Sequence, residues 1–431
     1  MITARAFAGK HYAVYGVARS GLAMVEAVLA SGAEVTAWDG SEEARAKLPD
    51  GAELADLDAV DLSQFDSLVV TPGLPLNRHP IAQRARDASV EIIGDIELFA
   101  RARPELPPHK VVGITGTNGK STTTALVHHI LQTAGVPSAM GGNIGLPILA
   151  QDPLPEGGVY VLELSSYQLD LTQSLDCDVA VLLNITPDHL DRYDSFEAYA
   201  ASKARLFEMQ TSGRVAVIAE DDEHCEAVGE RLGGEGFWLR NTIVSVGASN
   251  IEDQSKLPTL QGPHNAQNIA CAVAVCRHLG VSYSTIVGAL ETYPGLPHRM
   301  ERVGERGGVI FVNDSKATNP TAAAPALAAF PAIRWICGGR PKGDDLDECE
   351  PHFGHVRSAY TIGEAAELFE RLLKPHMPVK NCRELEVAVK AAADDAEAGD
   401  TVLLSPACAS FDQFKDFEER GDKFRELVGA L

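Results

Sequence analysis

The sequence lacks long hydrophobic runs, closely spaced cysteine pairs and an excess of positive charge. No apolar run reaches the ~18 residues that a membrane-spanning helix needs. Eight cysteines are scattered without any Cys-x-x-Cys pair, which favours buried thiols over disulfides or a zinc site. The first residues show no signal-peptide core followed by a cleavage site. We therefore expect a cytoplasmic protein without a membrane span.

Basic residues are outnumbered, because 37 Lys and Arg stand against 60 Asp and Glu and give a formal net charge of −23. Nucleic acids require a basic surface, so this balance argues against them as partners. An anionic ligand must instead be held by local features such as helix N-termini and a few placed cations. We expect small-molecule ligands, and we expect a monomer because no large interface is marked.

Strand-like and helix-like runs alternate along the chain, as is typical of α/β proteins with parallel sheets. Proline-rich segments at 101–110 and 293–299 interrupt this pattern and predict linkers. At 431 residues, the chain is also too long for one ordinary domain, so we expect three. The expected strands cover residues 11–17, 34–39, 67–73, 90–95, 111–116, 159–166, 179–186, 214–221, 308–315, 333–339, 359–363 and 401–406, with a helix near 264–279.

A glycine turn, "YGVARSG", follows the first expected strand and opens a helix. It reads Gly16-x-Ala18-x-x-Gly21, which is a dinucleotide fingerprint whose second glycine is replaced. Asp39 ends the next strand, where such folds place a ribose-binding acid. Three interpretations stay open: a diphosphate ligand, an NAD(P) cofactor, or tight packing of the helix alone.

The segment "GITGTNGKSTTT" (113–124) resembles a phosphate-binding loop but misses the strict P-loop spacing by one position. Gly116 and Gly119 would let consecutive backbone N–H groups turn inward and bind an anion. Lys120 would then reach the outer phosphates, and the Ser121 hydroxyl could ligate Mg²⁺. Because a buried strand precedes the loop and a helix follows it, we predict a nucleotide site.

Acidic residues that could accompany a magnesium–phosphate site end two expected strands. Glu163 ends an apolar strand and is either a metal ligand or a solvated strand end. The segment "NITPDHLDRY" follows the next strand and offers Asp188, His189 and Asp191. His189 could ligate metal, although a single loop histidine is equally often structural.

A lysine interrupts the apolar face of the helix expected after Ser195, its predicted N-cap. Helical spacing places five residues on that face: Phe196, Tyr199, Ala200, Lys203 and Phe207. Lys203 either extends its ammonium group to solvent or is partly buried with a lowered pKa, reactive as a neutral amine.

Taken together, these segments resemble the Mur ligase family of ATP-dependent enzymes, which add amino acids to the UDP-N-acetylmuramoyl precursor of peptidoglycan. The resemblance covers essentially the whole chain and is strongest to the members that add D-glutamate. Folylpolyglutamate synthetases share the ATP core but lack the N-terminal domain. The segments that carry the resemblance are "GITGTNGKSTTT", "GGNIG" (141–145), "LELSSYQL" (162–169), "DHLDRY" (188–193), "LPHR" (296–299), "NDSKATNP" (313–320) and "LSPACASFDQFKDFEERG" (404–421).

The resemblance implies a Rossmann-like precursor-binding domain at 1–104, a central P-loop-type mononucleotide-binding ATPase domain at 105–298, and a Rossmann-like amino-acid-binding domain at 299–431. For ATP it implies Gly116, Thr117, Asn118, Gly119, Lys120, Ser121, Thr122, Asn268, Arg299 and Asp314. For Mg²⁺ it implies Ser121, Glu163, His189 and Lys203, the last as a carbamylated lysine. For the UDP precursor it implies Gly73, Asn143 and His189. For D-glutamate it implies Thr318, Lys342, Ser410 and Phe417.

The implied catalytic residues are Lys120, Glu163, His189, Lys203 and Lys316. Members of the family often carry a Thr-Arg pair after the acid that corresponds to Asp39, and they use it at the uridine. Gly40 and Ser41 stand there in this chain, so Arg19 and Ser20 are the better candidates for uridine contacts.

The implied reaction uses ATP to convert the L-alanyl carboxylate of UDP-N-acetylmuramoyl-L-alanine into an acyl phosphate, which the D-glutamate amine attacks. Three alternatives stay open. Within the same class, the ligase could prefer L-glutamate. From other classes, the chain could be an NAD(P)-binding oxidoreductase or a nucleotide-binding module without enzymatic activity.

Overall fold

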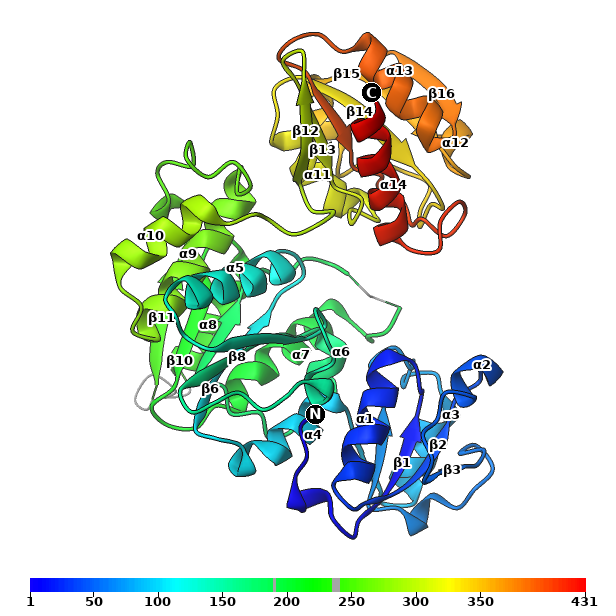
Figure 1. Cartoon of the computed structure of the whole chain (residues 1–431), viewed down its shortest axis with the longest axis vertical. Coiled ribbons are helices and arrows are strands. Elements are labelled where there is room, and N and C mark those ends of the chain that lie inside the picture. The colour runs from blue at the N-terminus through cyan, green and yellow to red at the C-terminus, as the bar shows by residue number, and fades with distance from the viewer. Residues whose placement is uncertain (189–190, 235–240) are drawn as a thin grey trace. The chain divides into compact units, whose positions relative to one another are not determined.

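The computed structural model describes residues 1–188, 191–234 and 241–431. The described residues form three sheets connected by helices, as expected for an α/β protein (Figure 1). Short 3-10 turns supplement them. No helix in these ranges is long and apolar enough to cross a membrane.

The chain divides into two compact units. The first comprises Met1–Ile251 with Gln267–Glu291, and the second comprises Glu252–Ala266 with Thr292–Leu431. The first unit holds two sheets, and the second holds one. The α/β class is therefore confirmed, while the domain boundaries near 104 and 298 stay predictions.

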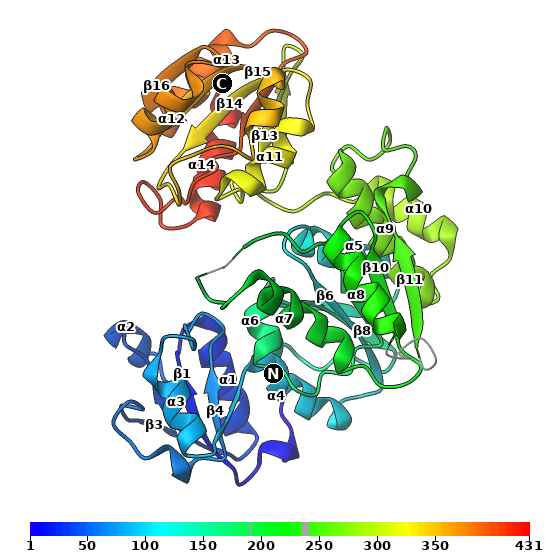
Figure 2. The same cartoon turned by 180° about the vertical axis from the view of Figure 1, so that it is seen from behind.

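The first sheet is parallel and has the order β3-β2-β1-β4-β5. Alternate residues of β1 enter two cores, because Tyr12 and Val14 pack with α1 while Ala13 and Tyr15 pack with α3. Figures 1 and 2 show these helices on opposite faces. The elements are β1 His11–Tyr15, α1 Arg19–Ala30, β2 Glu34–Trp38, α2 Glu42–Arg45, β3 Ala52–Leu54, β4 Ser67–Val70, α3 Pro80–Asp87, β5 Glu91–Ile93 and α4 Asp95–Ala102.

The central sheet is also parallel, with the order β11-β10-β9-β6-β8-β7. Ligand sites in such sheets lie at the carboxyl ends of the strands, so β6, β8 and β9 present their following loops at one edge. The elements are β6 His109–Thr115, α5 Lys120–Thr133, β7 Ser138–Gly142, β8 Gly158–Glu163, α6 Ser166–Asp170, β9 Val179–Leu182, α7 Phe196–Glu208, β10 Val215–Ala219, α8 Glu223–Gly234, β11 Thr242–Val246, α9 Pro263–His278 and α10 Tyr283–Thr292.

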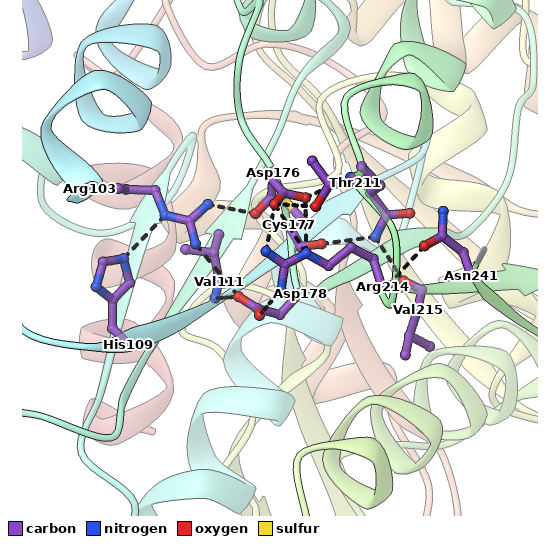
Figure 3. Close-up of polar contacts among 11 residues, drawn as sticks. Arg103, His109, Val111, Asp176, Cys177, Asp178, Thr211, Arg214, Val215 and Asn241 are labelled. Carbon is purple, nitrogen blue, oxygen red and sulfur yellow. Dashed lines mark hydrogen bonds and ion pairs between the residues drawn. The ribbon is translucent and has the colours of Figure 1, made fainter. Parts of the chain in front are cut away.

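The segment 101–110, expected as a linker, is fastened to the base of the central sheet rather than free (Figure 3). Arg103 donates through Nη1 to the Asp176 carbonyl (2.6 Å) and through Nε to His109 Nε2 (3.2 Å). Arg214 forms an ion pair with the Asp176 carboxylate at 2.5 Å. The first two sheets are thus joined by an ordered, hydrogen-bonded connection.

The third sheet has the order β12-β13-β17-β14-β15-β16, in which β12 alone is antiparallel to its neighbour. Trp335 and Leu403 pack with α11 and α12, whereas Ile336 and Leu404 pack with α13 and α14 on the other face. The elements are β12 Glu301–Arg306, β13 Val309–Asn313, α11 Pro320–Ala328, β14 Ile333–Gly338, β15 Val356–Ile362, α12 Ala366–Leu373, β16 Val379–Arg383, α13 Leu385–Asp395, β17 Thr401–Leu404 and α14 Phe417–Ala430.

Candidate active site

The predicted phosphate loop connects β6 to α5, and two of its glycines are sterically required. Gly116 has φ 153°, and a Cβ there would lie 2.9 Å from the Leu183 Cβ. Gly119 has φ 81°, and a Cβ there would lie 2.4 Å from Asn268 Oδ1. Both positions adopt backbone conformations that favour glycine. The loop can therefore keep its backbone N–H groups close to a ligand.

The loop shape is fixed by the segment that follows β9. The backbone N–H of Thr117 donates to the Asn184 carbonyl (2.9 Å), and that of Asn118 donates to Asn184 Oδ1 (2.7 Å). Helix α5 begins at Lys120, and the first turn of this helix, all of whose residues the structure describes, carries no acidic residue. Its N-terminus thus offers the positive end of a helix dipole to an anion.

Lys203 lies inside the protein beside this loop. Its side chain is 1% exposed, and Nζ donates to the Gly116 carbonyl oxygen at 2.8 Å. Lys120 Nζ donates to the same oxygen at 2.9 Å, so the two amines lie side by side. Burial, and then the charge of Lys120, hold the pKa of Lys203 well below its ordinary range. The solvent-directed alternative for Lys203 is therefore wrong, and the buried amine is confirmed.

Helix α7 positions Lys203 through the N-cap predicted at Ser195, whose side chain accepts the Ala198 N–H. Tyr199, one turn before Lys203, is also buried. Lys203 Nζ lies 4.5 Å from the Tyr199 ring centroid, and the Tyr199 hydroxyl is 3.0 Å from Thr117 Oγ1. The helix is thereby docked onto the phosphate loop.

Glu163 ends β8 at the same sheet edge and is 2% exposed. Asn143 Nδ2 donates to Glu163 Oε1 at 2.9 Å, while Oε2 is buried with no hydrogen-bond partner among the described residues. A buried carboxylate oxygen without a partner is costly unless a cation or donor completes it. Glu163 therefore fits a metal ligand, and the solvated alternative is wrong.

The N-terminal glycine turn is built for close packing. A Cβ at Gly21 would lie 1.9 Å from the Gly16 carbonyl oxygen. Asp39 accepts the Val17 N–H through Oδ2 and the Ser41 N–H through Oδ1, both at 2.8 Å. Asp39 thus joins the end of β2 to the glycine turn through backbone amides.

In the second unit, Asp314 follows β13 and is 7% exposed. Ser405 Oγ donates to its Oδ2 at 2.8 Å, and the Met300 N–H donates to its Oδ1 at 3.2 Å. Burial raises the pKa of Asp314 to about 7, despite these hydrogen bonds. The group is thus an unusually protonatable carboxyl at the end of a central strand.

Several predicted amino-acid-binding residues belong to loops at the same end of the third sheet. Arg340 and Ala409 exchange backbone hydrogen bonds of 2.9 and 3.0 Å, which fastens the loop before Lys342 to the loop before Ser410. Lys316 Nζ lies 3.8 Å from the Phe417 ring centroid. These contacts connect the predicted segments 313–320 and 404–421 to each other and to the loop that carries Lys342.

Arg420 joins two of these loops and was not singled out from the sequence. It is 1% exposed, and its guanidinium donates to Ser315 Oγ (3.0 Å), the Ser315 carbonyl (2.8 Å) and the carbonyls of Cys408 (3.1 Å) and Ala409 (3.3 Å). Burial lowers its pKa to about 10. The polar sequence of α14 gives no periodic signal for such a residue.

Two parts of the chain match known domain families. Residues 114–254 match the Mur ligase middle domain, and residues 298–408 match the Mur ligase, glutamate ligase domain. The chain is 60% identical, over its full length, to a UDP-N-acetylmuramoylalanine--D-glutamate ligase from Novosphingobium aromaticivorans, of which it covers 97%. The chain belongs to the Mur ligase family. This Mur ligase is also 54% identical to a relative of the same name from Zymomonas mobilis, over the full length of both.

Solved structures resemble this Mur ligase in fold. A UDP-N-acetylmuramate-alanine ligase from Thermotoga maritima matches with a TM-score of 0.58 at 16% identity, over 98% of this chain and 99% of the other. A pseudomurein peptide ligase from Methanothermus fervidus matches with a TM-score of 0.57 at 19% identity, over 98% and 100% of the two chains. At these identities, the likeness shows the fold alone.

The predicted residues of this Mur ligase divide between the units. The phosphate loop, Glu163, Asn143, Lys203 and Asn268 belong to the first, whereas Arg299, Asp314, Lys316 and the D-glutamate set belong to the second. Arg19 donates to the Gly145 carbonyl, so the first-domain turn reaches the loop that carries Asn143. His189 lies outside the described residues. No group of three or more His, Cys, Asp or Glu side chains suited to a metal occurs among the residues that are described.

Proposed function

We propose that this Mur ligase joins D-glutamate to UDP-N-acetylmuramoyl-L-alanine in an ATP-dependent, ADP-forming reaction of cytoplasmic peptidoglycan precursor synthesis, and that it acts as a monomer. The observation that carries the proposal is the identity of 60% over the whole chain to a ligase of that name. The glycine loop with two neighbouring lysines supports it independently, because phosphoryl transfer needs such a cluster of donors.

The chemistry begins with a carboxylate, whose oxygen is a poor leaving group. Transfer of the ATP γ-phosphoryl group to the L-alanyl carboxylate gives an acyl phosphate. The D-glutamate amine then attacks the carbonyl carbon, and the tetrahedral intermediate releases inorganic phosphate. Two anions must approach each other in the first step, so positive groups and backbone donors supply most of the stabilisation.

The first unit supplies those groups. We assign the N–H groups of residues 116–122 and the Lys120 ammonium to the ATP phosphates, with Asn268 as a further nucleotide contact. Glu163 and Ser121, with His189, would hold Mg²⁺, as the buried and unpartnered Glu163 oxygen suggests. The bound metal would neutralise charge between phosphate and carboxylate.

We propose that the Lys203 amine is carbamylated. Its amine is buried beside a second lysine, which favours the neutral form that reacts with CO₂. Carbamylation of the neutral amine by CO₂ forms an N–C bond and releases one proton, and it leaves a carboxylate where an uncharged amine stood. That carboxylate would serve as a further ligand for Mg²⁺.

The second unit is assigned the remaining contacts. Asp314 would contact the ribose and Arg299 the nucleotide, with Lys316 near the phosphates and the incoming amino acid. A lysine and a hydroxyl suit the side-chain carboxylate of glutamate. The residues assigned to D-glutamate are Thr318, Lys342, Ser410 and Phe417, and those assigned to the UDP precursor are Arg19, Ser20, Gly73, Asn143 and His189.

The test measures inorganic phosphate released from ATP with UDP-N-acetylmuramoyl-L-alanine and each of several amino acids. We expect release with D-glutamate and at most a trace with L-glutamate. Faster release with L-glutamate would overturn the stereochemical assignment. Nucleotide binding without any release would instead favour a binding module.

A further inference from the structure

The loop after β4 in the first sheet is gripped by the segment that follows β9 in the central sheet. Arg192 Nη2 donates to the Leu74 carbonyl (2.8 Å) and the Pro72 carbonyl (3.4 Å), and Nη1 donates to the Gly73 carbonyl (3.3 Å). The guanidinium also stacks on Tyr167, with Cζ 4.2 Å from the ring centroid. Arginine suits this place because its planar fork reaches several acceptors at once.

The grip is reciprocal. Asn77 Nδ2 and Arg78 Nη2 both donate to the Asp191 carbonyl, at 3.0 and 2.8 Å. Five hydrogen bonds therefore join residues 72–78 to residues 191–192, and we call this set the 72–192 clasp. All five bonds are accepted by main-chain carbonyls, four in number, so the clasp fixes the backbone path of both loops.

In the first sheet, the clasp holds the loop at the carboxyl end of β4, next to the carboxyl end of β1. The strand order reverses between these two strands, and we call their carboxyl ends the precursor-binding edge. The Thr71 N–H donates to the Tyr15 carbonyl (3.2 Å), and a Cβ at Gly16 would lie 2.4 Å from Thr71 Oγ1. The loop that begins at Thr71 thus lies against the glycine turn. Doubly wound sheets bind ligands at such a reversal, beyond the carboxyl ends of the strands.

On the central side, the clasp continues toward the reacting groups. Tyr193, next to Arg192, packs edge-on against Tyr199 with ring centroids 5.4 Å apart. Tyr199 contacts both Lys203 and the phosphate loop. An unbroken series of contacts therefore runs from the precursor-binding edge to the Lys203 amine, and Arg192 donates three of the five hydrogen bonds of the clasp in that series.

We propose that Arg192 is a positioning residue that holds the precursor-binding edge of the first sheet in register with the phosphate loop. This inference rests on the proposed function and adds to it a residue that touches no reacting atom. Loss of the clasp leaves the phosphate loop intact, because Asn184 fixes that loop separately. Loss of the clasp should therefore raise the KM for the UDP precursor and leave the KM for ATP unchanged.

The experiment compares Arg192→Gln and Arg192→Lys with the wild-type full chain. We expect Arg192→Gln to raise the KM for UDP-N-acetylmuramoyl-L-alanine at least about tenfold, since hydrogen bonds from a charged donor are lost. The KM values for ATP and D-glutamate should stay within about twofold, and Arg192→Lys should restore part of the loss. Equal rises in all three KM values, or no rise for the precursor, would overturn the proposal.

A matched control is Arg84→Gln. Arg84 also ties two main-chain carbonyls, those of Leu57 (2.7 Å) and Val60, but entirely within the first sheet's own domain. It should lower the melting temperature without changing the precursor KM. If Arg192→Gln does not fold, Asn77→Ala removes one bond of the clasp and should raise the same KM by a smaller factor.

Calorimetric titration of the UDP precursor separates the two claims. A wild-type protein that binds the precursor yet makes no amide with D-glutamate would overturn the proposed amino acid. In that case, weaker precursor binding by Arg192→Gln would still support the role of the clasp, and unchanged binding would refute it. A wild-type protein that does not bind the precursor would overturn both.

Discussion

Replacement of Asp314 by Asn should make the second unit more stable, and increasingly so as the pH rises. The side chain is 7% exposed, and burial raises its pKa from 3.8 to about 7. A carboxyl whose pKa is raised in the folded state contributes stability that is fully present below the unfolded pKa and lost as pH rises through the folded pKa. Asparagine has no charge to form, so it avoids this loss.

The size of the effect follows from the pKa. Each pH unit between 3.8 and about 7 costs about 1.4 kcal/mol. The Asp314→Asn variant should therefore be more stable by roughly 2 kcal/mol at pH 5.5 and by about 4 kcal/mol at pH 8. Its amide oxygen can still accept the Met300 N–H, and the Ser405 hydroxyl can turn to accept from the amide.

The assay is urea unfolding at several pH values, followed by tryptophan fluorescence. The chain has three tryptophans, so replacing Trp38 and Trp238 by Phe leaves Trp335, which is buried in the second unit. Exposed Asp344→Asn in the same unit should change stability by less than about 0.5 kcal/mol. An Asp314→Asn variant that is equally destabilised at both pH values would refute the reasoning. The ATP KM should rise as the ribose contact is lost.

Lys120→Ala should abolish ATP-dependent amide formation, and retained turnover in the phosphate-release assay would contradict the assigned loop role. Lys203→Ala should lose activity that formate or acetate partly restores, because a small carboxylate can replace the carbamate; no rescue at any concentration would count against carbamylation. Gly119→Ala should weaken ATP binding at least about tenfold in calorimetry, because its Cβ would meet Asn268 Oδ1 at 2.4 Å; unchanged affinity would refute the steric argument. Arg420→Met should lower the free energy of unfolding by about 3 kcal/mol and raise the D-glutamate KM, because it removes the hydrogen bonds that join two loops; an unfolding curve identical to that of the wild type would contradict this.

The sequence predicted the central strands of all three sheets but none of five others: β3, β7, β11, β12 and β16. Each of these lies at the edge of its sheet. The central strands β4, β8 and β9 are buried at every residue, whereas the edge strand β16 is exposed or half-buried throughout. Strands buried on both faces appear as continuous apolar runs, and edge strands mostly do not. The edge strand β5, which was expected at 90–95, is the exception.

Expected strands also extended past their true ends. Residues 179–186 were expected as one strand, but β9 ends at Leu182. Leu183 and Ile185 are fully buried in the loop that follows. An apolar run in the sequence indicates that the residues are buried. It does not show where the strand ends, because that depends on hydrogen bonding to the neighbouring strand.

The candidate site residues that one sequence can single out are those at which chemistry and spacing coincide. The glycine loop, the strand-ending Glu163 and the apolar-face Lys203 each break a local pattern, so each is visible in one sequence. Arg192 and Arg420 are not, because they bind main-chain carbonyls of loops distant in sequence. Only the folded chain shows which loops an arginine joins.

The most direct test of the central claim follows the oxygen atoms of the activated carboxylate. UDP-N-acetylmuramoyl-L-alanine labelled with ¹⁸O in its alanyl carboxylate is incubated with ATP, Mg²⁺ and D-glutamate, and the released inorganic phosphate is analysed by mass spectrometry. An acyl phosphate must transfer one labelled oxygen to phosphate for each amide formed. Phosphate that is released together with amide but carries no ¹⁸O would contradict the account.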